Sequence, residues 1–180
     1  MAKLELLMLM LPVVFMIHEY EEIVMFRSWL CRNKAELQRR FPKIEAFLAR
    51  QGHFDYSTAT FALGTAHEFV LISVVCFCAV WLGAYRWWFA ALMGHSLHLV
   101  VHIVQWAIYQ KYIPVIFTSI LTLPYCIYAL VEFSKASLLS PMQMCLWAAI
   151  GACLAAASLL PAFFVMAKFH HIHAKRESTV

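Results

Sequence analysis

A run of ionisable residues, His18, Glu19, Glu21 and Glu22, directly follows the apolar stretch of residues 6–17. Residues three and four positions apart share one face of an α-helix. His18, Glu21 and Glu22 should therefore project together, while Glu19 is turned by about 100° from His18. Imidazoles and carboxylates are ligands for zinc, manganese and non-haem iron. We predict that His18, Glu21 and Glu22 bind a metal ion, that Glu21 or Glu22 is catalytic, and that Glu19 stays outside.

A second set of polar residues lies in a later apolar stretch. His95, His98 and His102 are offset by three and seven positions, and Gln105 continues the same stripe. A lone histidine in a membrane helix more often packs or forms hydrogen bonds than binds a metal, and we prefer that interpretation for His95. We predict His98 and His102 as ligands, with His95 and Gln105 in supporting roles.

The pair His67-Glu68 interrupts a third apolar stretch. Adjacent helical residues point about 100° apart, so one side chain can face a site while the other supports it. We predict Glu68 as the ligand and His67 as the support, although the spacing leaves open which of the two faces inward.

The composition indicates a membrane protein. Hydrophobic residues make up 63% of the 180-residue chain and charged residues 13%, against about 45–50% and about 25% in soluble domains. The net charge of +4 is modest. We expect membrane lipid and a hydrophobic small molecule as partners rather than nucleic acid, whereas the oligomeric state stays open.

We predict an all-α fold, a single membrane domain of about five transmembrane helices. A helix needs about 20 residues to cross the hydrocarbon core. The first segment reaches that length only by including the polar cluster, and we read it as a retained helix rather than a secretory signal. The expected spans are residues 4–26, 57–85, 87–110, 112–131 and 140–167, followed by a polar tail at 168–180.

Between the first two spans, residues 30–50 combine basic residues with a periodic apolar pattern. This pattern predicts a short amphipathic helix on the cytoplasmic membrane surface. Pro42 should bend it or divide it. The apolar positions are Leu37, Phe41, Ile44, Phe47 and Leu48.

Charge placement predicts the orientation. Putting residues 27–56 in the cytoplasm places eleven of the 14 Lys and Arg residues inside and leaves only Lys3, Arg86 and Lys135 outside. The positive-inside rule then favours an external N-terminus and a cytoplasmic C-terminus. We expect a multi-pass protein of a bacterial-type inner membrane.

The three polar clusters should lie at similar depths. Counted from the cytoplasmic ends of their spans, His18 and His102 are eight residues in, His98 is twelve, and His67 and Glu68 are ten and eleven. At 1.5 Å per residue these depths agree to within about one helical turn. One buried site in the inner half of the bilayer is therefore expected, since ionisable groups at membrane depth are costly unless paired and mark function.

With the motif His18-x-x-Glu21-Glu22 on its first helix, the chain resembles the HXXEE family of small membrane proteins. His98 and His102 match the further histidines of that family, and Tyr112-Ile113-Pro114 and Pro124-Tyr125 resemble its later region. The resemblance implies a membrane protein with a metal or acid–base site. It implies no particular reaction.

The leading hypothesis is a metal-dependent intramembrane enzyme acting on a lipid or another hydrophobic molecule. Hydrolysis would fit zinc, and oxidation would fit iron. Membrane hydroxylases and desaturases carry more histidine clusters than this chain, so hydrolysis is favoured over oxidation.

Three alternatives stay open. A metal-independent, intramembrane protease-like enzyme would use a Glu-Glu dyad, but Arg27 is five residues after Glu22 rather than the four typical of such proteins. A metal, proton or small-molecule carrier would use the buried Glu and His residues as a relay. An assembly factor would use the polar site only to hold helices together.

Overall fold

The computed structural model describes residues 2–177, and in that part of the chain all regular structure is helical. The prediction of an all-α fold is confirmed. The six helices are α1 (Ala2–Arg40), α2 (Pro42–Arg50), α3 (Thr58–Leu82), α4 (Tyr85–Tyr109), α5 (Ile116–Lys135) and α6 (Pro141–Glu177). The last helix includes most of the expected polar tail, and residues 178–180 lie outside the described part.

Four helices are long and apolar enough to cross a membrane: α3, α4, α5, and α6 over Pro141–Ile172. This set is compatible with a membrane protein. The first helix is not among the four because its middle carries Glu19, Glu21 and Glu22. The fifth span predicted from the sequence therefore stays a prediction.

The first helix does not end near Phe26, where the predicted span ends. It continues to Arg40 and has 39 residues, a length of about 58 Å at 1.5 Å per residue. Much of the segment expected at the membrane surface is thus an extension of α1. Only Pro42–Arg50 forms a separate helix.

Pro42 accounts for the break between α1 and α2. Proline disfavours the helical conformation at the residue before it, and Phe41 has φ −136° and ψ 58°. Pro42 then takes the first helical position, where its missing N–H costs nothing. Ile44 and Phe47 on α2 are exposed, and a membrane surface as their partner stays a prediction.

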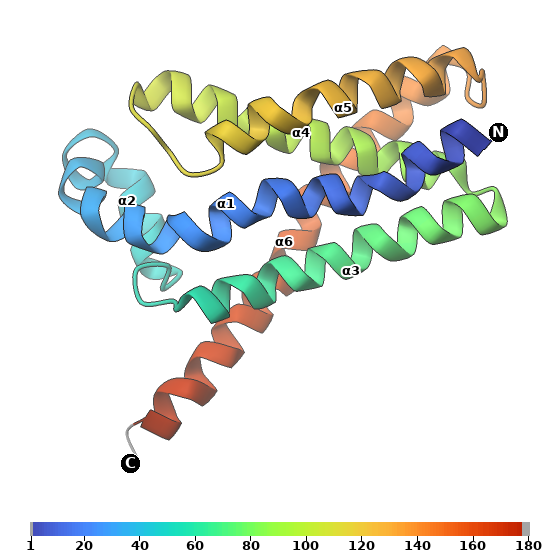
Figure 1. Ribbon diagram of the computed structural model, residues 1–180. Helices are drawn as coiled ribbons and strands as arrows, with labels where there is room; N and C mark the ends of the chain where they lie inside the picture. The colour runs from blue at the N-terminus through green and yellow to red at the C-terminus, as the bar shows by residue number, and fades with distance from the viewer. Residues whose placement is uncertain (1, 178–180) are drawn as a thin grey trace.

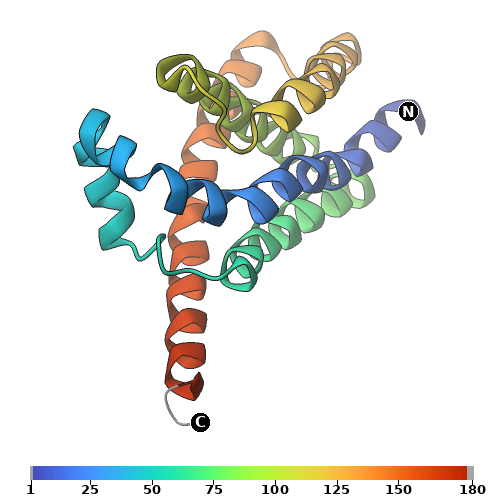
Figure 2. The same cartoon turned by 60° about the vertical axis from the view of Figure 1, so that its left-hand side comes forward.

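Helices α1, α3, α4 and α5 lie alongside one another with alternating directions, and α6 crosses them steeply (Figures 1 and 2). The first helix packs against α3 and α5, while α4 packs mainly against α6, α5 and α3. The backbones of α1 and α4 approach each other at few positions. That separation leaves room for large side chains between them.

One apolar cluster lies toward the N-terminal end of α1, and a second lies around Leu30 and Leu37 near its other end. The first cluster includes an aromatic stack. Trp88 of α4 is completely buried there and stacks on Phe133 of α5 with ring centroids 5.5 Å apart. Its indole Nε1 donates a hydrogen bond to the Met8 carbonyl at 3.1 Å. Tyr125 of α5 likewise donates to the Leu7 carbonyl at 2.6 Å. These bonds fix the depth of α1 relative to α4 and α5.

Two glycines allow α4 and α6 to approach closely. A Cβ on Gly151 would lie 2.1 Å from the Ala90 carbonyl oxygen, and one on Gly94 would lie 2.9 Å from the Gly151 carbonyl oxygen. Both obstacles are backbone atoms, which cannot swing aside. Since α4 also carries the buried histidines, this contact sets the position of the whole histidine stripe.

The close contact predicts that Gly151→Val destabilises the protein. Overpacking of this kind typically costs about 1–3 kcal/mol, and here two helices must separate. We expect a lower apparent Tm in detergent, measured by the loss of helical circular dichroism. Ala156→Val, at an exposed position of α6, is the control and should change the Tm little. Equal Tm values for the two variants would contradict the close packing.

A candidate metal centre between two helices

The first helix contributes three side chains to a polar cluster. His18 is completely buried and Glu19 is 6% exposed, whereas Glu22 is partly exposed. All three face the space between α1 and the neighbouring helices. Such groups are costly in an apolar interior unless they are paired or bind a metal.

The fourth helix contributes three histidines to the same cluster. The His18 ring centroid lies 5.8 Å from that of His95, 5.2 Å from that of His98 and 5.4 Å from that of His102. His98 and His102 are one helical turn apart, with their Nε2 atoms separated by 3.0 Å. Four imidazoles from two helices therefore converge in one buried volume.

Two groups within this cluster have the spacing needed to hold a metal ion. His18, His98 and His102 form one group, and Glu19, Glu22 and His98 form the other. In each group, the ligand atoms all lie within 4.8 Å of one another. Because His98 belongs to both, the five residues form one continuous set of nitrogen and carboxylate donors.

The buried Nε2 of His18 fits a metal ligand. Within the described residues, this atom has no hydrogen-bond partner. An unpaired buried polar atom costs about 1–3 kcal/mol, and a bound cation would satisfy it. Three imidazoles with carboxylates match the ligand preferences of zinc, iron and manganese. The donor set therefore fits a divalent transition metal.

Outer contacts hold two of these groups in place. Gln105 Oε1 lies 2.9 Å from His102 Nδ1, which directs the other ring nitrogen toward His98. Such a partner fixes the tautomer and orientation of a ligating histidine. Thr65 of α3 donates a hydrogen bond to Glu19 at 3.3 Å. The supporting position predicted for Gln105 is thus consistent with its contact.

The positions of Glu19 and Glu21 differ from the prediction. Glu19 lies inside the cluster, with a carboxylate oxygen 3.7 Å from His98 Nε2 and 4.0 Å from His18 Nε2. Glu21 lies in neither ligand group. On a helical wheel, Glu19 and Glu21 flank the line through His18 and Glu22. Which of them faces the site depends on where α4 and α5 lie.

Glu21 instead caps the start of α5. Its carboxylate accepts hydrogen bonds from the Thr118 backbone N–H at 2.9 Å, the Thr118 hydroxyl at 2.8 Å and the Tyr112 hydroxyl at 2.9 Å. The first backbone N–H groups of a helix have no partner within the helix, and an anion is favourable there. Glu21 therefore links α1 to α5 in this structure, and its role as a metal ligand stays a prediction.

His67 and Glu68 lie at the edge of the site. Their side chains face each other, with His67 Nδ1 and Glu68 Oε1 3.3 Å apart, and neither belongs to a ligand group. Glu68 interacts electrostatically with His98. His95 also lies outside the ligand groups, and it packs edge-on against Phe15 with ring centroids 5.7 Å apart.

The segment between α4 and α5 closes one end of the site. Gln110 and Val115 have positive φ angles of 60° and 78°, a strained conformation for a β-branched residue such as valine. Tyr112, between them, bonds to Glu21. Burial and this hydrogen bond raise the pKa of Tyr112 to about 12, so its hydroxyl stays a hydrogen-bond donor at neutral pH.

The comparisons with known proteins identify a family. A family described as "Protein of unknown function with HXXEE motif" matches residues 9–129. The chain belongs to the HXXEE family. No curated protein and no solved structure matches it.

The three specified residues of the HXXEE motif are His18, Glu21 and Glu22, and they make two kinds of contact in this structure. His18 and Glu22 enter the ligand groups, whereas Glu21 secures α5.

Sequence reasoning missed Glu19, Thr65 and Thr118. Threonine hydroxyls in apolar segments carry no pattern that marks them as partners of a carboxylate. Glu19 occupies a position that the HXXEE motif leaves unspecified, and only the placement of α3 and α4 reveals its role.

The capping contact predicts that Glu21→Ala lowers stability. Leaving the partners of a buried hydrogen-bonded group unsatisfied costs about 1–3 kcal/mol. We expect a lower Tm and faster amide hydrogen exchange at Thr118. Glu21→Gln keeps an acceptor oxygen, so its effect should be smaller. If both variants exchange like the wild-type protein at Thr118, the cap does not exist in solution.

The ligand groups predict different effects for neighbouring substitutions. His98→Gln and Glu19→Gln should each weaken metal binding at least about tenfold, since even changes outside the ligands often cost that much. His95→Gln should leave it nearly unchanged. Equilibrium dialysis with elemental analysis of detergent-purified protein measures these affinities. Equal losses for His95→Gln and His98→Gln would contradict the assignment.

Proposed function

We propose that this HXXEE protein is a metal-dependent intramembrane enzyme acting on a lipid or another hydrophobic substrate. The supporting observation is the convergence of His18, His98 and His102 with two carboxylates in an otherwise apolar bundle. His18, His98, His102 and Glu19 would hold a divalent zinc, iron or manganese ion. Such an ion, when bound, polarises a substrate oxygen or activates water.

Glu22 is the side chain best placed for proton transfer. Among residues 2–177, Glu22 accepts no hydrogen bond, whereas Glu19 is fixed by Thr65 and Glu21 by Thr118. It is also partly exposed while remaining in the ligand group of His98. A carboxylate that no hydrogen bond holds, beside His98, suits a general acid or base.

The site is open on one side. The His98 side chain keeps 34% of its surface exposed, although His18 itself is completely buried. If the four apolar helices cross the bilayer, this opening faces the hydrocarbon region or the space between helices. A hydrophobic substrate could reach the metal centre there without passing through water.

The proposed topology makes α1 a fifth span. It lies against α3 and α5, two of the four helices that could cross a membrane. Its polar residues face partners on α3, α4 and α5 and are thereby shielded. The N-terminus would be external and the C-terminus cytoplasmic in a bacterial-type inner membrane, as the distribution of Lys and Arg favours.

Glu22→Gln tests the enzymatic proposal. Removing a general acid or base should lower turnover by about 10²–10⁴-fold. Because Glu22 also belongs to one of the two ligand groups, turnover is compared at equal metal content. The assay uses protein reconstituted into vesicles of mixed lipids, with mass spectrometry of the lipids and elemental analysis of the protein. A chelator should abolish both metal content and turnover.

Other outcomes favour the alternatives. The stripe of His95, His98, His102 and Gln105 is a continuous polar column along α4, which is the feature a proton or metal carrier needs. Bound metal with transmembrane flux and no lipid turnover would establish a carrier. Turnover by folded protein without metal would establish a Glu-dyad enzyme. Folded protein with neither metal nor turnover would contradict the proposal.

A further inference from the structure

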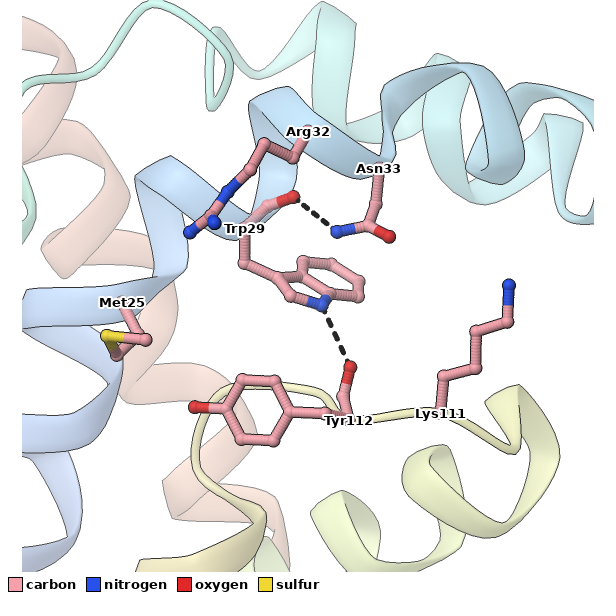
Figure 3. Close-up of a pocket in the computed structure, with 6 residues that line it drawn as sticks. All are labelled: Met25, Trp29, Arg32, Asn33, Lys111 and Tyr112. Atoms are coloured by element: carbon pink, nitrogen blue, oxygen red, sulfur yellow. Dashed lines mark hydrogen bonds between the residues drawn. The ribbon is translucent and has the colours of Figure 1, made fainter.

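A hollow lies between α1 and the segment that joins α4 to α5 (Figure 3). Its volume is about 470 Å³, within the range of about 300–1,000 Å³ for small-molecule sites. Arg32 and Lys111 lie on opposite sides of the Trp29 indole (Figure 3). The remaining lining residues are Met25, Asn33 and Tyr112.

Hydrogen bonds hold the walls of this hollow in place. Trp29 Nε1 donates to the Tyr112 carbonyl at 2.9 Å. Asn33 Nδ2 donates to the Trp29 carbonyl at 2.8 Å, and Asn33 Oδ1 accepts from the Tyr109 hydroxyl at 3.0 Å. The walls of the hollow are therefore ordered before a ligand binds. Binding then carries little of the entropic cost of ordering side chains.

The charges around the hollow are unbalanced. Lys111 lies 2.9 Å from both carboxylate oxygens of Glu36, and Arg40 lies 3.2 Å from one of them. Both hold the pKa of Glu36 below its usual range, so this acid stays ionised at neutral pH. Arg32 bonds only to the Ser28 carbonyl and hydroxyl, at 3.1 and 2.8 Å, and has no acidic partner in residues 2–177. The residues that line the hollow thus include two cations, Arg32 and Lys111, and no carboxylate, so the hollow favours an anion.

The hollow and the metal centre share one face of α1. Glu22, Met25, Trp29 and Arg32 are spaced by three, four and three residues, so their side chains form one stripe. Arg32 is about 15 Å along the helix from Glu22 at 1.5 Å per residue. A molecule with its charged end at Arg32 could lay an apolar chain along Met25 toward Glu22.

We propose that this hollow binds the phosphate headgroup of an anionic phospholipid, with an acyl chain lying along Met25 toward the metal centre. A guanidinium matches phosphate with paired hydrogen bonds, and indole rings suit the membrane interface. The identity of this lipid as the substrate rests on the proposed function. Headgroup binding itself needs neither metal nor turnover.

The test is native mass spectrometry of the full chain in detergent, titrated with phosphatidylglycerol or phosphatidylcholine carrying identical acyl chains. The wild-type protein should bind phosphatidylglycerol at least about tenfold more tightly, as expected for a charge-assisted contact. Arg32→Gln should remove that preference. Glu36→Gln, which releases Lys111, should strengthen it. Arg39→Gln alters an exposed residue of the same helix and should have no effect.

Several results would overturn the headgroup site. These are equal wild-type affinities for the two lipids, equal losses in Arg32→Gln and Arg39→Gln, and displacement of the lipid by millimolar inorganic phosphate. His98→Gln separates this proposal from the metal centre: it should lose metal and keep the lipid preference. Loss of that preference in folded His98→Gln would mean that the lipid binds through the metal centre instead.

Discussion

The arrangement of the whole site depends on the contact between the Glu21 carboxylate and the first turn of α5. A negative charge inside an apolar bundle is tolerable only with strong compensation, and here two N–H or O–H groups of Thr118 and the Tyr112 hydroxyl supply it. The contact fixes the rotation of α1 about its own axis. Once Glu21 faces α5, His18 must face α4, and Glu19 must face Thr65 on α3.

Because of that rotation, Glu19, Glu21 and Glu22 face different neighbours. Glu21 is held by α5 and Glu19 by α3, while Glu22 accepts no hydrogen bond within residues 2–177. On the opposite side, α4 presents its histidines because the glycine contact with α6 holds it at a distance from α1. The space between α1 and α4 is therefore set by packing elsewhere in the bundle. Polar groups then fill it.

Much of this could be predicted from the sequence, and the failures have a physical cause. His18, His98 and His102 were predicted to meet because helical spacing and depth are determined by residue number alone, and the structure brings them together. The structure places Glu19 rather than Glu21 beside the histidines, which the helical wheel could not indicate because it gives angles relative to the helix axis, not directions to neighbouring helices. Thr65 and Thr118 were missed because a hydroxyl in an apolar segment resembles any other small residue.

The same contacts explain how α1 can be more polar than α3, α4, α5 and α6, the four helices that are apolar enough to cross a membrane. Hydropathy treats each residue as if it faced lipid, and by that measure the acids of α1 exclude it from the helices that could cross a membrane. In the bundle those acids face threonines, a tyrosine and histidines instead. The acids of α1 thus have polar partners only when α3, α4 and α5 are packed around it. If α1 is the fifth span proposed above, it is stable at membrane depth only when α3, α4 and α5 surround it, so its stability and the integrity of the site depend on the same contacts.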